Sequence, residues 1–184
     1  IAHPTAETGP PTPDVVELAR VTDRGIRESK MVDMKQLVLE KDKSVIGIFC
    51  DNAVTDHDGN LFDVCSYATT AALCSCKLPK FEMKDDVPVK IEGETMDPPI
   101  STIPVSVTMI KIGDYILVDP NMDEWSCLDA RVTMTSNSDG NIVALQKGGA
   151  GGFTHEQLIK CSEISVQVGA KIRETIKSAS QSSN

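Results

Sequence analysis

The pattern of apolar and polar residues, together with helix start and stop signals, predicts three helices. The first covers residues 13–29, with Thr12 in the N-cap position and a proline as the first helical residue. The second covers residues 63–77 and is rich in alanine and threonine, which suits close packing against a sheet. The third begins with the capping box Thr154-x-x-Gln157 and extends to about residue 177.

Strand signals occupy the stretches between these helices. Residues 35–40 and 44–55 predict two strands, and the run S-V-I-G-I-F-C in the second one predicts that it is mostly buried. Residues 81–101 contain charged pieces, a glycine and a pair of prolines, which predicts a hairpin or an excursion at the surface. Strands at hairpin-like spacing are predicted over residues 103–112, 115–118, 131–135 and 142–146.

The length and composition predict one α+β domain with a substantial core. The chain has 184 residues, of which 40% are hydrophobic and 24% charged, as is ordinary for a globular protein. Residues 1–12 are rich in proline and threonine and are interpreted as an extended linker from a missing N-terminal part. The domain itself is assigned to residues 13–177, and the S-A-S-Q-S-S-N stretch at 178–184 is expected to be a disordered tail. No apolar run approaches the ~18 residues of a membrane span, so no membrane partner is expected.

The net charge of −9 arises from 18 basic and 27 acidic residues. Free-standing nucleic-acid binders are usually basic, because phosphate neutralisation supplies much of their affinity. The acidic balance therefore argues against a broad RNA-coating surface, but it is compatible with a narrow basic strip. Arg20, Arg24 and Arg27 form such a strip on one arc of the first helix, and taken alone they are typical of a solvated or salt-bridged face. The opposite, apolar arc contains Val15, Leu18, Ala19 and Ile26.

Six cysteines are present, and their spacing favours reduced thiols over disulfides. No pair has the C-x-x-C spacing, and several lie inside apolar segments, as expected for a protein of the reducing cytoplasm. A metal or redox site at Cys74 and Cys76 is the alternative, although no histidine or cysteine cluster nearby completes it. The cysteines are Cys50, Cys65, Cys74, Cys76, Cys127 and Cys161.

Three further groups of residues have a chemical and a structural interpretation. The acids Asp123, Glu124 and Asp129 could form a metal site, but solvated acids with ordinary hydrogen-bonding partners are favoured. The glycines of residues 148–152 lack the G-K-[ST] of a phosphate loop and are interpreted as a flexible connection. His57 lies in a turn without a nucleophilic partner at a recognisable spacing, so an exposed turn histidine is expected. No metal site is predicted.

Several motifs, in order and spacing, resemble one known family. They are L-A-R-V-T-D-R-G-I-R-E-S-K at 18–30, D-x-D-G-N-L-F-D at 56–63, L-V-D-P at 117–120 and D-G-N-I-V-A-L-Q-K-G-G at 139–149. Together they resemble the RNase PH family of phosphate-dependent 3′→5′ exoribonucleases, and more narrowly the non-catalytic RNase PH-like subunit of the archaeal exosome. The resemblance implies an α+β fold of the RNase PH type, with mixed β-sheets packed against helices and without the first strands of the family.

The resemblance also implies that the catalytic groups of the family are absent. Active relatives hold inorganic phosphate with an arginine and a hydroxyl residue at a helix start, and they carry two aspartates six residues apart. Here Phe62 and Asp63 stand at the first two positions, and Trp125 and Arg131 at the other two. A phenyl ring cannot neutralise phosphate, a carboxylate repels it, and neither tryptophan nor arginine binds Mg²⁺. No catalytic residue is therefore predicted, and Asp63 is interpreted as a first-turn acid that favours the helix dipole.

By resemblance, the chain is expected to be a non-catalytic core subunit of an exosome ring for 3′→5′ RNA degradation and processing. The ring would contain three copies each of this chain and a homologous catalytic subunit, joined by RNA-binding cap proteins. That complex would use inorganic phosphate and Mg²⁺, whereas this chain would have no cofactor of its own. Single-stranded RNA would contact Arg20, Arg24 and Arg27, the last of which lies near the helix end beside Glu28. The alternatives are an active phosphate-dependent exoribonuclease and an assembly module without RNA contact.

Overall fold

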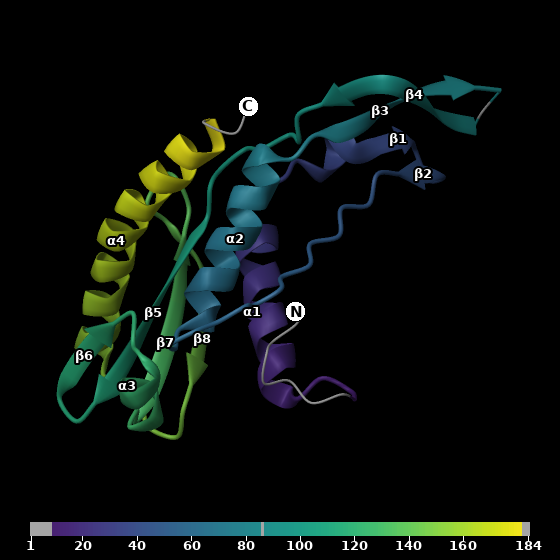
Figure 1. Ribbon diagram of the computed structural model, residues 1–184. Coiled ribbons are helices and arrows are strands. Elements are labelled where there is room, and N and C mark those ends of the chain that lie inside the picture. The colour runs from purple at the N-terminus through teal and green to yellow at the C-terminus, as the bar shows by residue number, and fades with distance from the viewer. Residues whose placement is uncertain (1–8, 86, 182–184) are drawn as a thin grey trace.

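A four-stranded antiparallel sheet organises the chain, in the order β6-β5-β7-β8 (Figure 1). The computed structural model describes residues 9–85 and 87–181. Two antiparallel hairpins, β1–β2 and β3–β4, form separate small sheets. The elements in chain order are α1 (Pro13–Glu28), the 3₁₀ helix η1 (Met34–Leu37), β1 (Val38–Glu40), β2 (Ser44–Val45), α2 (Leu61–Ser75), β3 (Leu78–Lys84), β4 (Val87–Met96), β5 (Val105–Ile112), β6 (Tyr115–Val118), α3 (Met122–Ser126), β7 (Ala130–Ser136), β8 (Ile142–Gly148) and α4 (His155–Gln181). The expected α+β class is confirmed, although every described strand pair is antiparallel and the expected mixed sheets are not found.

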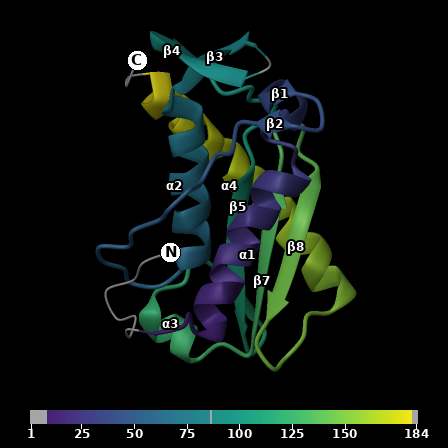
Figure 2. The same cartoon turned by 90° about the vertical axis from the view of Figure 1, so that its right-hand side faces the viewer.

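The two faces of the large sheet differ in chemistry, because β5 and β7 alternate apolar and hydroxyl residues. Val105, Val107 and Met109 are fully buried in the core cluster to which Cys161 and Ile176 of α4 belong. The opposite face carries hydroxyl groups that bond to one another, such as Ser106 to Thr135 at 2.8 Å and Thr108 to Thr133 at 2.9 Å. Figure 2 shows α1 and α4 on opposite sides of this sheet, with α2 beside β5. The hydroxyl face is therefore the one that meets α1.

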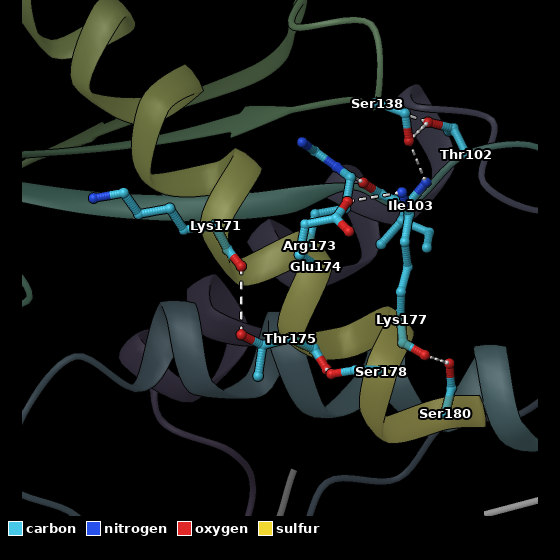
Figure 3. Close-up of polar contacts among 10 residues, drawn as sticks. All are labelled: Thr102, Ile103, Ser138, Lys171, Arg173, Glu174, Thr175, Lys177, Ser178 and Ser180. Atoms are coloured by element: carbon cyan, nitrogen blue, oxygen red, sulfur yellow. Dashed lines mark hydrogen bonds and ion pairs between the residues drawn. The ribbon is translucent and has the colours of Figure 1, made fainter. Parts of the chain in front are cut away.

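For the long helix α4, the sequence predicts the start correctly but places the end too early. Its predicted capping box is confirmed, since Gln157 N donates to Thr154 Oγ1 and Thr154 N donates to Gln157 Oε1. The helix continues to Gln181, so residues 178–181 do not belong to a disordered tail as expected. Residues 182–184 lie outside the described residues. Buried Arg173 ties the helix to the sheet by donating to Ile103 O at 2.7 Å and Ser136 O at 3.0 Å, as Figure 3 shows for Ile103. Main-chain carbonyl groups thus hold the guanidinium of Arg173. Desolvation by burial lowers the pKa of this side chain.

The predicted buried strand over residues 44–55 is wrong. Only Ser44–Val45 forms a ladder, with β1, and the rest of the segment forms no strand. Phe49 is 92% exposed and Val45 is 67% exposed. The apolar run has strand propensity, but among the described residues no strand pairs with it beyond Val45. The 81–101 excursion is confirmed as a hairpin and is formed by β3 and β4.

The N-terminal predictions are confirmed in part. Helix α1 has the expected bounds within one residue, but the Thr12 side chain makes no capping hydrogen bond. Residues 9–12 precede the helix without regular structure, whereas residues 1–8 of the expected linker lie outside the described residues. Ala19, expected on the apolar arc, is exposed, because the buried arc is centred on Leu18, Val21 and Gly25.

Candidate functional site around Arg131

Arg131 is the centre of a cluster that joins α1, α2, α3 and β7. It is a buried residue of β7, and its Nη2 donates to Glu17 Oε1 at 2.8 Å. Its guanidinium carbon lies 4.0 Å from the ring centre of Phe62 and 5.4 Å from the ring of Trp125. The two rings stack on each other, with centres 6.1 Å apart and planes 21° apart. The structure thus brings together the three substituted positions Phe62, Trp125 and Arg131.

Local sequence features position each member of this cluster. Phe62 lies in the first turn of α2, next to Leu18, Val21 and Cys65 in a small apolar cluster. Trp125 lies on α3, and a capping box between Asn121 and Glu124 starts this helix. Gly59 has a φ of +102°, and a side chain there would collide with the main chain of Asn121. Glycine at this turn therefore allows α3 to approach the start of α2 closely.

Gly148 makes the space that Arg131 occupies. It pairs with Arg131 across β7 and β8, and a Cβ there would lie 2.7 Å from Arg131 Nε. The expected flexible connection is therefore wrong for Gly148, which is the last residue of a strand. The next glycines are also closely packed, because Cβ atoms at Gly149 and Gly151 would meet the main chain around Asp129.

The cluster cannot perform the chemistry of phosphorolysis. The Arg131 side chain is 6% exposed and its charge is matched by Glu17 and the two ring faces, so it is not open to an inorganic phosphate. A metal ion does not fit either, because the one carboxylate of the cluster, Glu17, is already paired with Arg131, and the other groups are a cation and two aromatic rings. Across residues 9–85 and 87–181, no group of three or more His, Cys, Asp or Glu side chains could hold a metal. What the arrangement can do is fix the positions of the elements that meet there.

Asp63 has a role that sequence reasoning missed. β6 pairs only with residues 109–112 of β5, and beyond this point the carboxylate of Asp63 accepts from Thr108 N at 2.9 Å and Thr108 Oγ1 at 2.7 Å. Asn60 Nδ2 also donates to it at 2.9 Å. Burial raises the pKa of the Asp63 carboxyl to about 6, against the opposing effect of these hydrogen bonds. Asp63 is in the first turn of α2, as expected, but its contacts also connect that helix to the edge of β5.

The three arginines of α1 lie in three different environments. Arg20 is exposed, and no hydrogen bond or ion pair joins it to another described residue. Arg24 is half-buried, and its Nη1 donates to Gln146 Oε1 of β8 at 2.8 Å. Arg27 is exposed between Asp23 and Glu28, with nitrogen–oxygen distances of 3.6 Å to each. The salt-bridged interpretation therefore fits Arg27, whereas Arg20 and Arg24 retain a charge that no described carboxylate balances.

Gln146 and Glu17 connect the arginine strip to the Arg131 cluster. Gln146 Nε2 donates at 3.0 Å to Glu17 Oε1, the same oxygen that accepts from Arg131. A continuous chain of contacts thus leads from the two rings through Arg131, Glu17 and Gln146 to Arg24. Sequence reasoning missed Glu17 and Gln146, since no local pattern relates two residues that are 129 positions apart.

The remaining candidates have structural roles. Glu124 caps α3, and Asp129 Oδ2 accepts from Gly113 N at 2.7 Å, as the favoured interpretation of these acids predicted. His57 is half-buried rather than exposed, and its Nδ1 accepts from Gly59 N at 3.3 Å. All six cysteines have free thiols, and Cys74 and Cys76 are half-buried.

Comparison with known proteins identifies the family. Residues 1–79 match the profile described as "3′ exoribonuclease family, domain 1", and residues 102–168 match "3′ exoribonuclease family, domain 2". The chain belongs to the RNase PH family of 3′ exoribonucleases. It is 44% identical over 180 residues to the exosome complex component Rrp42 of Thermococcus kodakarensis, covering 97% of this chain and 66% of that protein. It is 39% identical to the Rrp42 of Pyrococcus furiosus, covering all of this chain and 67% of that protein.

Solved structures agree with this assignment to the RNase PH family. The chain is similar to one in a structure of the Archaeoglobus fulgidus exosome with RNA bound to the active site. The TM-score is 0.83 and the identity 40%, over 95% of this chain and 66% of that one. Rice Rrp46 shares the fold alone, with a TM-score of 0.61 and 14% identity over 95% of this chain and 69% of that one. The expected RNase PH-like fold is confirmed, and this chain spans about two thirds of the length of the curated relatives that it matches.

Proposed function

We propose that this chain is a non-catalytic core subunit of an exosome ring for phosphorolytic 3′→5′ RNA degradation and processing. One observation carries the proposal: Phe62, Trp125 and Arg131, which the resemblance assigns to the family's catalytic positions, are packed together as a cation–π cluster. They are packed in place, so phosphate and metal cannot displace them without disrupting the junction of α1, α2 and α3. The similarity to the Rrp42 components of archaeal exosomes supports the same function.

The proposal includes a catalytic partner. A homologous RNase PH-like subunit would alternate with this chain in a ring of three copies each and would provide the phosphate and Mg²⁺ sites that this chain lacks. Cap proteins that bind RNA would join the ring. Large apolar side chains are exposed on and beside the β1–β2 hairpin, and a neighbouring subunit that covered them would remove this apolar area from water; they include Met34, Val45 and Phe49. The free cysteines are compatible with the reducing cytoplasm.

RNA contact through Arg20 and Arg24 is the second component of the proposal. Both retain positive charge without a described carboxylate partner, and guanidinium groups bind phosphate oxygens in a bidentate manner. Arg27 is a weaker candidate for RNA contact, because Asp23 and Glu28 already surround its charge.

No helix in the described part of the chain is long and apolar enough to cross a membrane.

Phosphate-dependent degradation of a single-stranded RNA tests this function. The full-length protein would be assayed alone and after assembly with the homologous catalytic subunit, with release of nucleoside diphosphates as the measurement. We expect no release by the protein alone and release on mixing. Nucleoside diphosphates from the folded protein alone, in a preparation free of contaminating nuclease, would instead support the active-exoribonuclease alternative.

A further inference from the structure

The contact between Arg24 and Gln146 differs from the ion pairs of exposed Arg27. Arg24 Nη1 donates to a neutral amide oxygen at 2.8 Å, so the contact restrains the guanidinium without neutralising it. Arg27, by comparison, lies between two carboxylates. Within residues 9–85 and 87–181, none of the other Arg24 N–H groups has a hydrogen-bond partner. Arg24 is half-buried and its Nη1 is held by Gln146. The remaining N–H donors of its guanidinium are therefore presented in a defined direction.

The orientation of the Gln146 amide is set by the residue on its other side. Glu17 is a carboxylate and can only accept, so the NH₂ group of Gln146 must face it, and the amide oxygen must face Arg24. Glu17 is in turn held by buried Arg131 at 2.8 Å. Because Arg131 is enclosed by Phe62 and Trp125, this end of the chain of contacts is rigid.

We propose that Gln146 is a positioning residue for RNA binding, which acts by fixing the guanidinium of Arg24 through its amide oxygen. The inference rests on the proposed function, in which Arg24 contacts the RNA backbone. An arginine side chain loses much rotamer freedom when it binds, and a side chain ordered beforehand loses less. Phe62, Trp125 and Arg131 thereby serve RNA binding indirectly, because they anchor the carboxylate that orients Gln146.

A double-mutant cycle tests this role. The ring would be assembled from the full-length protein and its catalytic homologue, and its affinity for a fluorescein-labelled single-stranded RNA would be measured without phosphate and Mg²⁺. We expect Gln146→Met to raise the dissociation constant roughly three- to tenfold, the scale of the cost of immobilising one rotamer-rich side chain on binding. In an Arg24→Ala background the same substitution should have no effect, because its target is absent.

Gln146→Glu provides a second variant of nearly the same shape. It would turn the restraint on Arg24 into an ion pair and would set two carboxylates against each other at Glu17, so RNA affinity should fall at least as far as in Gln146→Met. Gln167→Met is the matched control, since Gln167 is an exposed residue of α4, on the other side of the sheet. It should leave the affinity unchanged.

The possible outcomes separate this inference from the proposed function. If Arg24→Ala weakens RNA binding but Gln146→Met and Gln146→Glu do not, the positioning role is refuted and the RNA role of Arg24 stands. Equal losses from Gln146→Met in both backgrounds would also refute it, because the loss would not pass through Arg24. If Arg24→Ala itself has no effect, the RNA contact in the proposed function fails, and the positioning role fails with it.

Discussion

The ion pair between Glu17 and Arg131 is the polar contact whose removal should most reduce stability at this junction. The Arg131 side chain is 6% exposed and that of Glu17 is 32% exposed. Removing the carboxylate would leave a buried guanidinium that two ring faces stabilise only in part, at about 0.5–2 kcal/mol. Breaking a fully buried pair costs about 3–5 kcal/mol, and partial solvent access to Glu17 lowers this. We therefore expect Glu17→Ala to reduce the free energy of unfolding by about 2–3 kcal/mol.

Urea unfolding of the full-length protein measures this change, with the fluorescence of Trp125 as the probe. Trp125 is the only tryptophan of the chain and lies beside Arg131, so it reports directly on the cluster. Glu28→Ala is the control, because Glu28 meets Arg27 at 3.6 Å on the surface and should contribute less than about 0.5 kcal/mol. Glu17→Gln, which retains a hydrogen-bond acceptor without the charge, should cause about half the loss of Glu17→Ala.

One result would refute the reasoning about this pair. If Glu17→Ala destabilised the protein no more than Glu28→Ala does, the charge of Arg131 would be balanced without Glu17. The cluster would then be held by the aromatic contacts alone. The connection from Arg131 to the arginine strip would lose its energetic basis.

Three further predictions concern neighbouring positions. Gly148→Ala would displace the guanidinium of Arg131, so urea unfolding should show a loss of about 1–3 kcal/mol, and an unchanged midpoint would contradict this packing. Because the pKa of Asp63 is raised from 3.8 to about 6 in the folded protein, the stability that it contributes is complete below pH 3.8 and is lost as the pH rises through about 6. Asp63→Asn should therefore destabilise most at low pH, and a loss in urea unfolding that grows with pH would contradict the sign. Replacing Arg20 and Arg24 together by Glu should weaken RNA binding by the assembled ring by about 1–3 kcal/mol and flatten its salt dependence, whereas unchanged affinity would favour the assembly-only alternative.

Much of the secondary structure could be predicted from the sequence, because it depends on neighbouring residues. The strands of the large sheet follow from alternation, and the start of α4 follows from the Thr154 and Gln157 capping box, which closes within four residues. The predicted strand over residues 44–55 failed for the complementary reason. Val45 and Phe49 have strand propensity, but a strand also needs a neighbour, and the described residues supply one only as far as Val45.

The candidate site divides in the same way. The resemblance to the RNase PH family predicted that Phe62, Trp125 and Arg131 stand at its catalytic positions, and the chemistry of these side chains was enough to argue against phosphate and metal binding. Their union into one stacked cluster was decided by the tertiary structure, because α2, α3 and β7 bring together residues that are 63 and 6 positions apart. The partners of Arg24 and Arg131 were likewise beyond the reach of local patterns, since Gln146 and Glu17 meet only after β8 packs against α1. The sequence by itself determined which side chains stand at these positions and what chemistry they lack, and the fold determined how the buried charge of Arg131 is held.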